Sequence, residues 1–431
     1  MKRRLLLAVT ALALAAGFVP ATPGMAATRH AGRFTPAPHR KPPQLVNHGW
    51  TPKPLRIITF VPSSYPYAGQ LRAFPDAIVH SQWLAAFSKA YGIPSDPPPV
   101  ARGILVDPAD LPVLTKTSTV SDLMPFLDAQ TDLHHIAQAP AYQTIYLLYL
   151  QCTPPQSLDG FGCVSHHPAV PVKQDDTRYT ALDSFAMSEG APAPGVAGRN
   201  ALTSTVIHEL IEAATDTGPN GWYLRAADAD RPWETASPIV EDEGSGNIEV
   251  ADYLQGSRWF EKYQPEGSPQ PIRYEYVRAY SHYGNAHRND PGVPVSPHPY
   301  YNVSTVRSWF DAPRGATTSI VVRAWSSRPV GHGGFFTVHA TITAWLDSSS
   351  RGGATTKPNP CSIPYQGWTV KNGTTFPFRL KVKGNAPKAT YCVVRFTSAF
   401  YPTPANGDIY HVWYVGFTPA LHTAAATHAA T

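Results

Sequence analysis

The chain has 431 residues, of which 43% are hydrophobic and 15% are charged, and its formal net charge is +5. If a targeting segment at the start of the chain is removed, about 400 residues remain. That is more than one hydrophobic core usually serves, so we expect two domains. The basic balance is mild, and neither a basic stripe nor a nucleic-acid-binding motif is apparent along the chain. We therefore predict no nucleic-acid partner.

The first 27 residues have the pattern of a secretory signal peptide. Basic residues at positions 2 to 4 precede an apolar run that begins at Leu5, and the small residues Ala26 and Ala27 follow. A membrane anchor is the alternative, but this run is short for a membrane span and no other apolar run approaches ~20 residues. We therefore predict a soluble, secreted protein of the extracellular space, with no stable membrane insertion.

Residues 28–54 are rich in proline and basic side chains and lack apolar periodicity, which indicates an extended spacer or a pro-segment. Helix and strand signals begin after this segment. Residues 80–91 place apolar side chains at three- and four-residue steps before Gly92, which predicts a helix. Residues 144–152 carry the strongest signal for a buried strand. Further strands are expected at residues 55–61, 178–187 and 272–281, and a further helix at residues 121–130.

The four cysteines indicate disulfides and not a metal cluster, because none of them stands in a CxxC arrangement. An exported protein meets an oxidising compartment, where such cysteines pair. The positions suggest that Cys152 pairs with Cys163 and that Cys361 pairs with Cys392. Each bridge would then lie within one domain.

The main candidate site lies in residues 203–216, TSTVIHELIEAATD. Asn200 can cap a helix over this segment, and residues four apart on a helix lie on the same face. His208 and Glu212 form such a pair within reach of one small ion, and imidazole and carboxylate are both accepted zinc ligands. Glu209 follows His208 directly, as does the general base of the metalloprotease helix, which takes a proton from the attacking water. The alternative is an amphipathic helix with its acidic residues exposed to solvent.

A third metal ligand is expected from residues 246–253, GNIEVADY. Either Glu249 binds the metal and Asp252 orients the imidazole of His208, or the two carboxylates have the opposite roles. The alternative is an acidic patch on a solvated helix or turn.

Two further side chains are candidates for stabilising an oxyanion during catalysis. His167 stands beside His166 in the segment that follows the predicted strand 144–152, and either histidine could approach the metal or the substrate. Tyr223 lies with Trp222 in an aromatic-rich segment and could line a cleft. The alternatives are an ordinary loop histidine and an aromatic residue of the core.

Residues 306–420 change to short segments with period-two alternation, separated by clusters of Gly, Pro, Asn and Ser, and we predict a compact all-β sandwich there. A low-complexity tail follows at residues 421–431. Exposed aromatic side chains on such a domain could bind polysaccharide, and a role in stability or surface attachment is the alternative.

Three motifs in matching order resemble the exordium or phosphate-induced family of exported plant proteins and the bacterial secreted proteins that share their core. They are HELIEAATD at 208–216, NGWYL at 220–224 and EVADYL at 249–254. The resemblance covers roughly residues 55 to 285 and implies an exordium-like, zincin-like domain with a metallopeptidase-like site, in a family whose plant members are associated with the extracellular matrix and cell growth. Leu254 stands where the family has a cysteine, so the family's disulfide pattern cannot be carried over to this half.

The predicted architecture is an α+β zincin-like domain at residues 55–305 followed by the β-sandwich. The predicted function is that of a secreted zinc-dependent hydrolase and, within that class, a metallopeptidase. One Zn²⁺ would be bound by His208 and Glu212 with Glu249 or Asp252, while Glu209 would act as the base. A peptide or protein would be the substrate, and a cell-wall or matrix polymer could bind the β domain.

Two alternatives to this hydrolase remain. One is a non-catalytic protein of the extracellular matrix or cell surface, with a structural metal site and a binding β-sandwich. A carbohydrate-active enzyme is a weaker possibility, because carboxylates such as Glu209, Glu212 and Glu249 could pair as acid and base but would leave His208 without a task.

Overall fold

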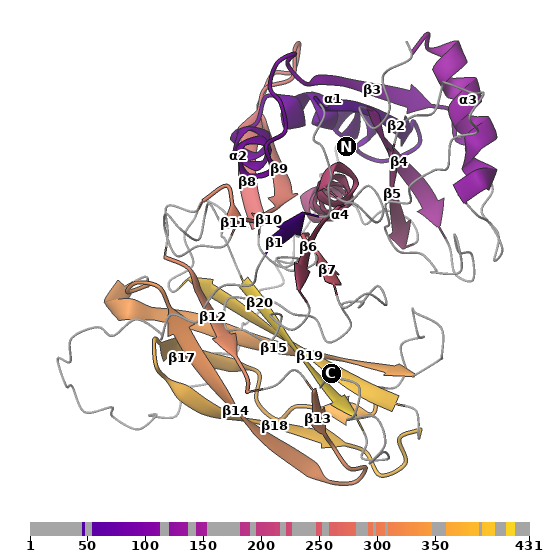
Figure 1. Cartoon of the computed structure of the whole chain (residues 1–431). Helices are drawn as coiled ribbons and strands as arrows, with labels where there is room; N and C mark the ends of the chain where they lie inside the picture. The colour runs from indigo at the N-terminus through magenta and orange to yellow at the C-terminus, as the bar shows by residue number, and fades with distance from the viewer. Residues whose placement is uncertain are drawn as a thin grey trace, which may run out of the picture. The chain divides into compact units, whose positions relative to one another are not determined.

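Figure 1 shows the structure, a computed structural model of the whole chain. Strands dominate the part that it describes, which contains twenty strands and four α-helices. No helix among the described residues is both long and apolar enough to cross a membrane. The described residues are 45–47, 54–112, 120–136, 144–152, 182–189, 195–215, 221–225, 247–251, 258–281, 292–295, 299–306, 309–330, 332–346, 359–387, 390–400 and 411–418.

A four-stranded sheet with the order β3-β2-β4-β5 organises the first half of the chain, and all its neighbouring strands are parallel. Parallel neighbours need crossover connections, and helices lie between several of these strands in the sequence. The strands are β2 (Arg56–Pro62), β3 (Val100–Val106), β4 (Thr144–Cys152) and β5 (Leu182–Glu189). The helices are α1 (Ala68–Val79), α2 (Gln82–Tyr91), α3 (Met124–Leu133) and α4 (Gly195–Thr215).

The expectation of an α+β zincin-like domain is therefore wrong. An α+β domain keeps its helices to one face or end of an antiparallel sheet. Here strands dominate, and the sheet that packs against α4 is entirely parallel, with helices interleaved between its strands. Local periodicity indicates which segments are helices and strands, but it does not indicate the direction in which the strands pair.

Local capping explains where α2 begins and ends. The Ser81 hydroxyl accepts a hydrogen bond from the Leu84 backbone N–H at 2.9 Å, and Gly92 ends the helix in the left-handed conformation, with φ of 70°. The carboxylate of Glu261 also accepts hydrogen bonds from the backbone N–H groups of Gln82 and Trp83, at 3.0 and 2.7 Å. These contacts attach the start of α2 to a strand residue that lies 179 positions after Gln82 in the chain.

The other strands of the first half form three smaller groups. All of these strands except β1 follow α4 in the sequence. One sheet has the order β1-β6-β7, β8 pairs with β9, and β10 pairs with β11, all in antiparallel fashion. Their bounds are β1 (Leu45–Asn47), β6 (Trp222–Arg225), β7 (Asn247–Glu249), β8 (Arg258–Tyr263), β9 (Ile272–Val277), β10 (Ala279–Tyr280) and β11 (Gly292–Val293).

Helix α4 is a buried element of the first core. It packs against β4, β5, β9 and α1, and its apolar residues Val206, Ile207, Leu210 and Ile211 are fully buried in that core. The helix begins at Gly195, so Asn200 lies inside it and the prediction that Asn200 caps it is wrong. Polar side chains on a helix that is buried on most of its surface need hydrogen-bond or charge partners in the surrounding structure.

The last part of the chain forms a β-sandwich, which confirms the all-β prediction for this region. One sheet has the order β12-β14-β18-β16, and the other has the order β13-β20-β19-β15-β17. Alternate residues of β14 and β18 point into the second core, as in Ile320, Val322, Phe378 and Leu380. The strands are β12 (Tyr301–Ser304), β13 (Trp309–Asp311), β14 (Thr317–Ser326), β15 (Phe335–Leu346), β16 (Cys361–Ser362), β17 (Gly367–Lys371), β18 (Thr375–Val382), β19 (Thr390–Phe400) and β20 (His411–Thr418).

The predicted disulfide between Cys361 and Cys392 is confirmed. It joins β16 of one sheet to β19 of the other and therefore links the two sheets covalently. Cys152 ends β4, whereas Cys163 lies outside the described residues, so the pairing of these two cysteines stays a prediction.

Removing the sandwich disulfide is expected to destabilise the protein. The two cysteines are 31 residues apart, and opening a loop of that size lowers the free energy of unfolding by about 2–4 kcal/mol. Denaturant unfolding of a Cys361→Ala/Cys392→Ala variant measures this change, with tryptophan fluorescence as the probe. Wild-type protein kept under a strong reductant is the matched control and should unfold like the variant. Equal midpoints for the variant and the oxidised wild type would contradict the prediction.

Candidate metal centre

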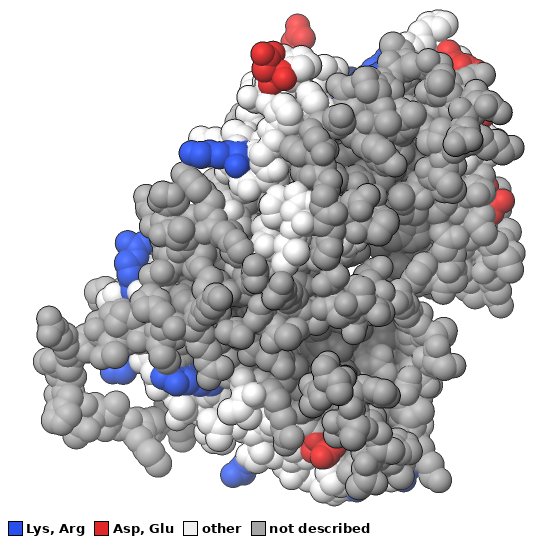
Figure 2. All heavy atoms as spheres, in the orientation of Figure 1, with Lys and Arg blue, Asp and Glu red and all other residues white. Residues whose placement is uncertain are grey.

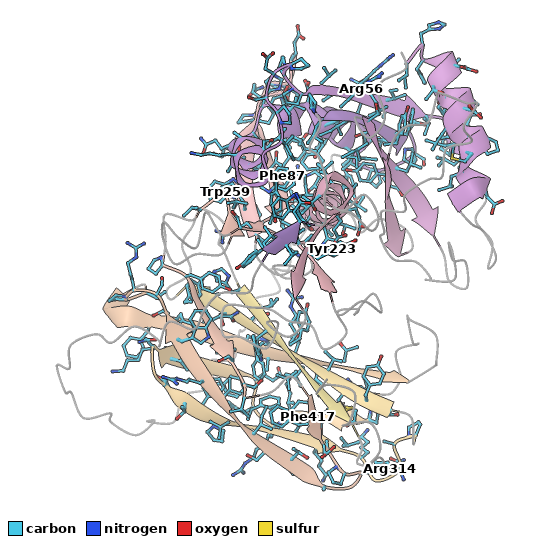
Figure 3. All side chains as sticks on the ribbon, in the orientation of Figure 1. Arg56, Phe87, Tyr223, Trp259, Arg314 and Phe417 are labelled. Carbon is cyan, nitrogen blue, oxygen red and sulfur yellow. A yellow bond between two sulfur atoms is a disulfide. The ribbon has the colours of Figure 1, made fainter. Side chains whose placement is uncertain are left out.

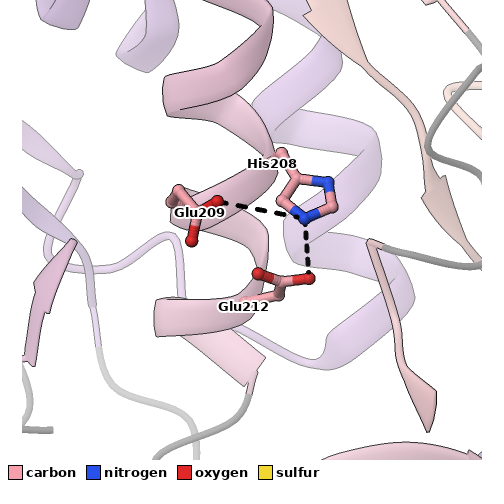
Figure 4. A group of neighbouring side chains, drawn as sticks. All are labelled: His208, Glu209 and Glu212. Carbon is pink, nitrogen blue, oxygen red and sulfur yellow. Dashed lines mark ion pairs between the residues drawn. The ribbon is translucent and has the colours of Figure 1, made fainter. Parts of the chain in front are cut away.

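Helix α4 brings together His208, Glu209 and Glu212 (Figure 4). One turn of helix separates His208 from Glu212, and the Nε2 atom of His208 lies 3.1 Å from Oε1 of Glu212. The same nitrogen lies 4.0 Å from Oε1 of Glu209. One possible ligand atom from each side chain lies within 4.8 Å of the other two. The cluster therefore has the size of a site for a single ion.

The three side chains lie in the protein interior. Only 12% of the His208 side chain and 2% of each glutamate side chain are exposed. The alternative of an amphipathic helix with Glu209 and Glu212 on its solvent-exposed face is therefore wrong. Buried carboxylates require pairing, hydrogen bonds or a metal ion, since transfer of an isolated carboxylate from water costs several kcal/mol or more. Two carboxylates that converge on one imidazole form a set of donors suited to a divalent cation.

The distances distinguish the two glutamates. Two ligand atoms at about 2.1 Å from one tetrahedral zinc ion lie about 3.4 Å apart, and they can never be more than about 4.2 Å apart. His208 forms ion pairs with both glutamates, and its 3.1 Å distance to Glu212 is also close to the tetrahedral value, whereas its 4.0 Å distance to Glu209 is near the upper limit. The pair His208 and Glu212 therefore fits a tetrahedral zinc ion better than the pair His208 and Glu209. This leaves the Glu209 carboxylate beside the site, where a general base is needed.

Strand pairing places Tyr223 of β6 opposite Glu249 of β7, and Figure 3 labels Tyr223. Directly paired residues of an antiparallel ladder project from the same face of the sheet, with Cβ atoms about 5 Å apart. The next residues, Val250 and Ala251, are fully buried in the same core as the apolar residues of α4. The chain therefore enters the core around α4 directly after Glu249. The side chain of Glu249 itself lies outside what the structure describes.

Trp222 is half-buried and packs against the first core, with its ring 5.8 Å from that of Tyr91 in an edge-on arrangement. This agrees with a core position for Trp222. Because side chains alternate along a strand, the neighbouring Tyr223 projects from the opposite face of β6. Asp252, His166 and His167 lie outside the described residues, so the roles predicted for them and for Tyr223 stay predictions.

Sequence reasoning missed Arg199, which fixes the start of α4. Its guanidinium is buried and donates hydrogen bonds to Oε1 of Gln70 at 2.7 Å and to the carbonyl of Arg273 at 2.6 Å. It also lies 5.6 Å from the centre of the Tyr274 ring. The partners are 129 and 74 residues away in the sequence, so no local pattern could have indicated them. These contacts hold α4 against α1 and β9 and so position the helix that carries the cluster.

Comparison with known proteins gives no family for this chain. No protein-family model and no curated protein matches it. Among solved structures, the PapD-like domain 7 of human CEP192 is similar over 30% of this chain and 89% of its own, with 4% identity and a TM-score of 0.22. The Escherichia coli chaperone DraB (28% of this chain, 56% of its own, 9% identity, TM-score 0.19) and domain 1 of VCBP3 from Branchiostoma floridae (29%, 98%, 11%, 0.17) are similar to a comparable extent. TM-scores this low support no conclusion about function.

Proposed function

We propose that this protein binds one zinc ion at α4 and is a secreted zinc-dependent hydrolase, with a peptide or protein as its substrate. The observation that carries the proposal is the 3.1 Å separation of His208 Nε2 and Glu212 Oε1 inside the protein, because it suits two ligands of one tetrahedral ion. Glu249 or Asp252 would complete the ligand set, since Val250 and Ala251, which stand between them in the sequence, are buried in the same core as the apolar residues of α4.

A bound zinc ion would supply Lewis acidity that polarises a carbonyl group. Glu209 then has the role of a general base, since its buried carboxylate lies beside His208 and can accept a proton from an attacking water molecule. Tyr223, which pairs with Glu249 between β6 and β7, is the candidate donor to the resulting oxyanion. The three exordium-like motifs and the signal-like N-terminus support an extracellular setting for this reaction.

One observation favours a non-catalytic metal site as the second candidate. Only 2% of each glutamate side chain is exposed, and a metal that is closed off from solvent has a structural role more often than a catalytic one. In that case the protein would belong to the extracellular matrix or cell surface, and the ion would stabilise the packing of α4. Zinc content does not separate the two candidates, whereas hydrolysis of a broad peptide library does.

Zinc analysis of the purified, signal-free protein tests the site itself. After dialysis against buffered zinc, we expect about one equivalent of zinc in the wild type and almost none in a His208→Ala variant, because a tetrahedral site that loses one of its protein ligands binds far more weakly. His339→Ala is the matched control, since His339 is an exposed residue of β15, and it should retain the metal. Absence of stoichiometric zinc from the wild type, or equal zinc in both variants, would overturn the proposal.

A further inference from the structure

One face of the β-sandwich is exposed and basic. Residues that alternate with the buried ones on β14 and β18 point outward, and among them are Arg323, Arg379 and Lys381. Lys383, directly after β18, is exposed as well. We call these four residues the basic face. No ion pair involves any of them within the part of the chain that the structure describes.

Strand register explains how the basic face forms from residues that are far apart in the sequence. Arg379 stands opposite Ser319, Lys381 opposite Thr317, and Arg323 opposite Thr375. Lys381 also pairs with Ser362 of β16 on its other side. Since strands rise about 3.4 Å per residue, the span from position 375 to position 381 is about 20 Å. The sequence shows no basic stripe for two reasons. Arg323 and Arg379 come from different strands, and the inward-pointing Leu380 stands between Arg379 and Lys381 in the sequence.

The C-terminal part of the chain is positively charged as a whole, which agrees with a basic face on the sandwich. Residues 301–431 contain twelve Lys and Arg and only three Asp and Glu, whereas residues 1–300 contain more acidic than basic residues. Among the described residues of the sandwich, the single acidic side chain is Asp311, which lies on β13 in the other sheet. Figure 2 shows blue side chains over the region where Figure 1 draws the sandwich. A field of one sign attracts a partner of the opposite sign.

We propose that the basic face binds a linear polysaccharide that carries carboxylate or sulfate groups. Guanidinium groups bind such groups through two parallel hydrogen bonds, and Lys381 adds a point charge two residues from Arg379. The hydroxyl residues Thr317, Ser319 and Thr375 stand opposite Lys381, Arg379 and Arg323 on the neighbouring strand, and their hydroxyls can form hydrogen bonds with sugar hydroxyls. A sheet face about 20 Å long presents these groups as an extended track, which suits an extended polymer.

Other polyanions fit this face less well. Proteins that bind single-stranded nucleic acid supply exposed aromatic rings on which bases stack, and the one aromatic residue at an outward position of β14 and β18, Trp325, is buried against Tyr300. Duplex DNA is read by an element that enters a groove, which a sheet face does not supply. Insertion into a membrane surface needs large exposed apolar side chains, and the exposed apolar residues at the outward positions of these two strands are limited to Val321 and Pro377.

Binding to heparin and to polygalacturonate, measured by calorimetry at low and physiological salt, tests the proposal. An Arg379→Gln/Lys381→Gln variant should bind either polymer roughly 2- to 30-fold more weakly, because each exposed charge pair contributes modestly, and its binding should depend less steeply on salt. The matched control is Arg72→Gln/Lys262→Gln, which removes one Arg and one Lys from exposed positions outside the sandwich and should bind like the wild type. Zinc content is unaffected in both variants, so this test does not depend on the metal site.

Three results would overturn the proposal. The first is wild-type protein that binds neither polymer at low salt. The second is an equal loss of binding in the two double variants, which would mean that net charge and not the basic face attracts the polymer. The third is tighter binding to single-stranded DNA, duplex DNA or phosphatidylserine vesicles than to both polysaccharides under the same salt conditions.

Discussion

Replacing Glu209 with glutamine should lower peptide hydrolysis by roughly 10²- to 10⁴-fold while the zinc content stays the same, because a general base contributes about that much to the rate. The amide has nearly the shape of the carboxylate, so the buried position beside His208 can accept it, but it cannot take a proton from water. The measurement is kcat/KM on the best substrate from a peptide library, with zinc measured on the same preparation.

Glu212→Gln is the matched control for this experiment, since it makes the same chemical change one helical turn from His208. We expect Glu212→Gln to lose zinc and activity together, because a neutral amide is a much weaker zinc ligand than a carboxylate. A Glu209→Gln variant that is as active as the wild type would refute the role of Glu209 as the base. Loss of zinc from Glu209→Gln and not from Glu212→Gln would exchange the roles of the two glutamates.

Replacing Gly103 with alanine should destabilise the first core by about 3 kcal/mol or more, because a backbone has to move to make room. Gly103 lies in β3, where α1 packs closely against the sheet. A Cβ atom at this position would lie 1.8 Å from the carbonyl oxygen of Arg72 and 2.7 Å from its carbonyl carbon. Both are backbone atoms of α1, so a side-chain rotation cannot relieve the overlap. Denaturant unfolding followed by circular dichroism measures the change.

Gly69→Ala is the control for Gly103→Ala. Gly69 lies in the first turn of α1, and nothing stands within 4 Å of a Cβ atom built there. Alanine favours the helix over glycine, so this variant should be as stable as the wild type or more stable by up to about 1 kcal/mol. If both alanine variants unfold at the wild-type midpoint, the close approach of β3 to α1 does not exist in solution.

Elements with a clear local signal were predictable from the sequence. The strand β4 occupies residues 144–152 as expected, and α2 ends at Gly92 as the pattern of residues 80–91 indicated. Helix α1 was missed because Pro75 lies inside it and interrupts the helical pattern, yet burial of Leu71, Phe74 and Ile78 holds the helix in place. Tertiary packing outweighed local propensity there.

The candidate site was predictable only in its local part. The pair His208 and Glu212 depends on helix geometry alone, so the spacing in the sequence was sufficient. Their burial was not predictable, because α4 packs against β9 as well as β5, and β9 begins at Ile272, far along the chain from the helix. The pairing of Tyr223 with Glu249 likewise depends on a register between strands that no local pattern specifies.

The burial of α4 has a consequence for the order of events when the chain folds. The helix packs on β4 and β5, which precede it, and equally on β9, which begins at Ile272 and therefore emerges during synthesis well after His208. Contacts between segments so far apart form late, because the loop between them must first close. We therefore expect His208 and Glu212 to become buried only after residue 277 has been made, and a zinc ion to stabilise the folded core without guiding its early assembly.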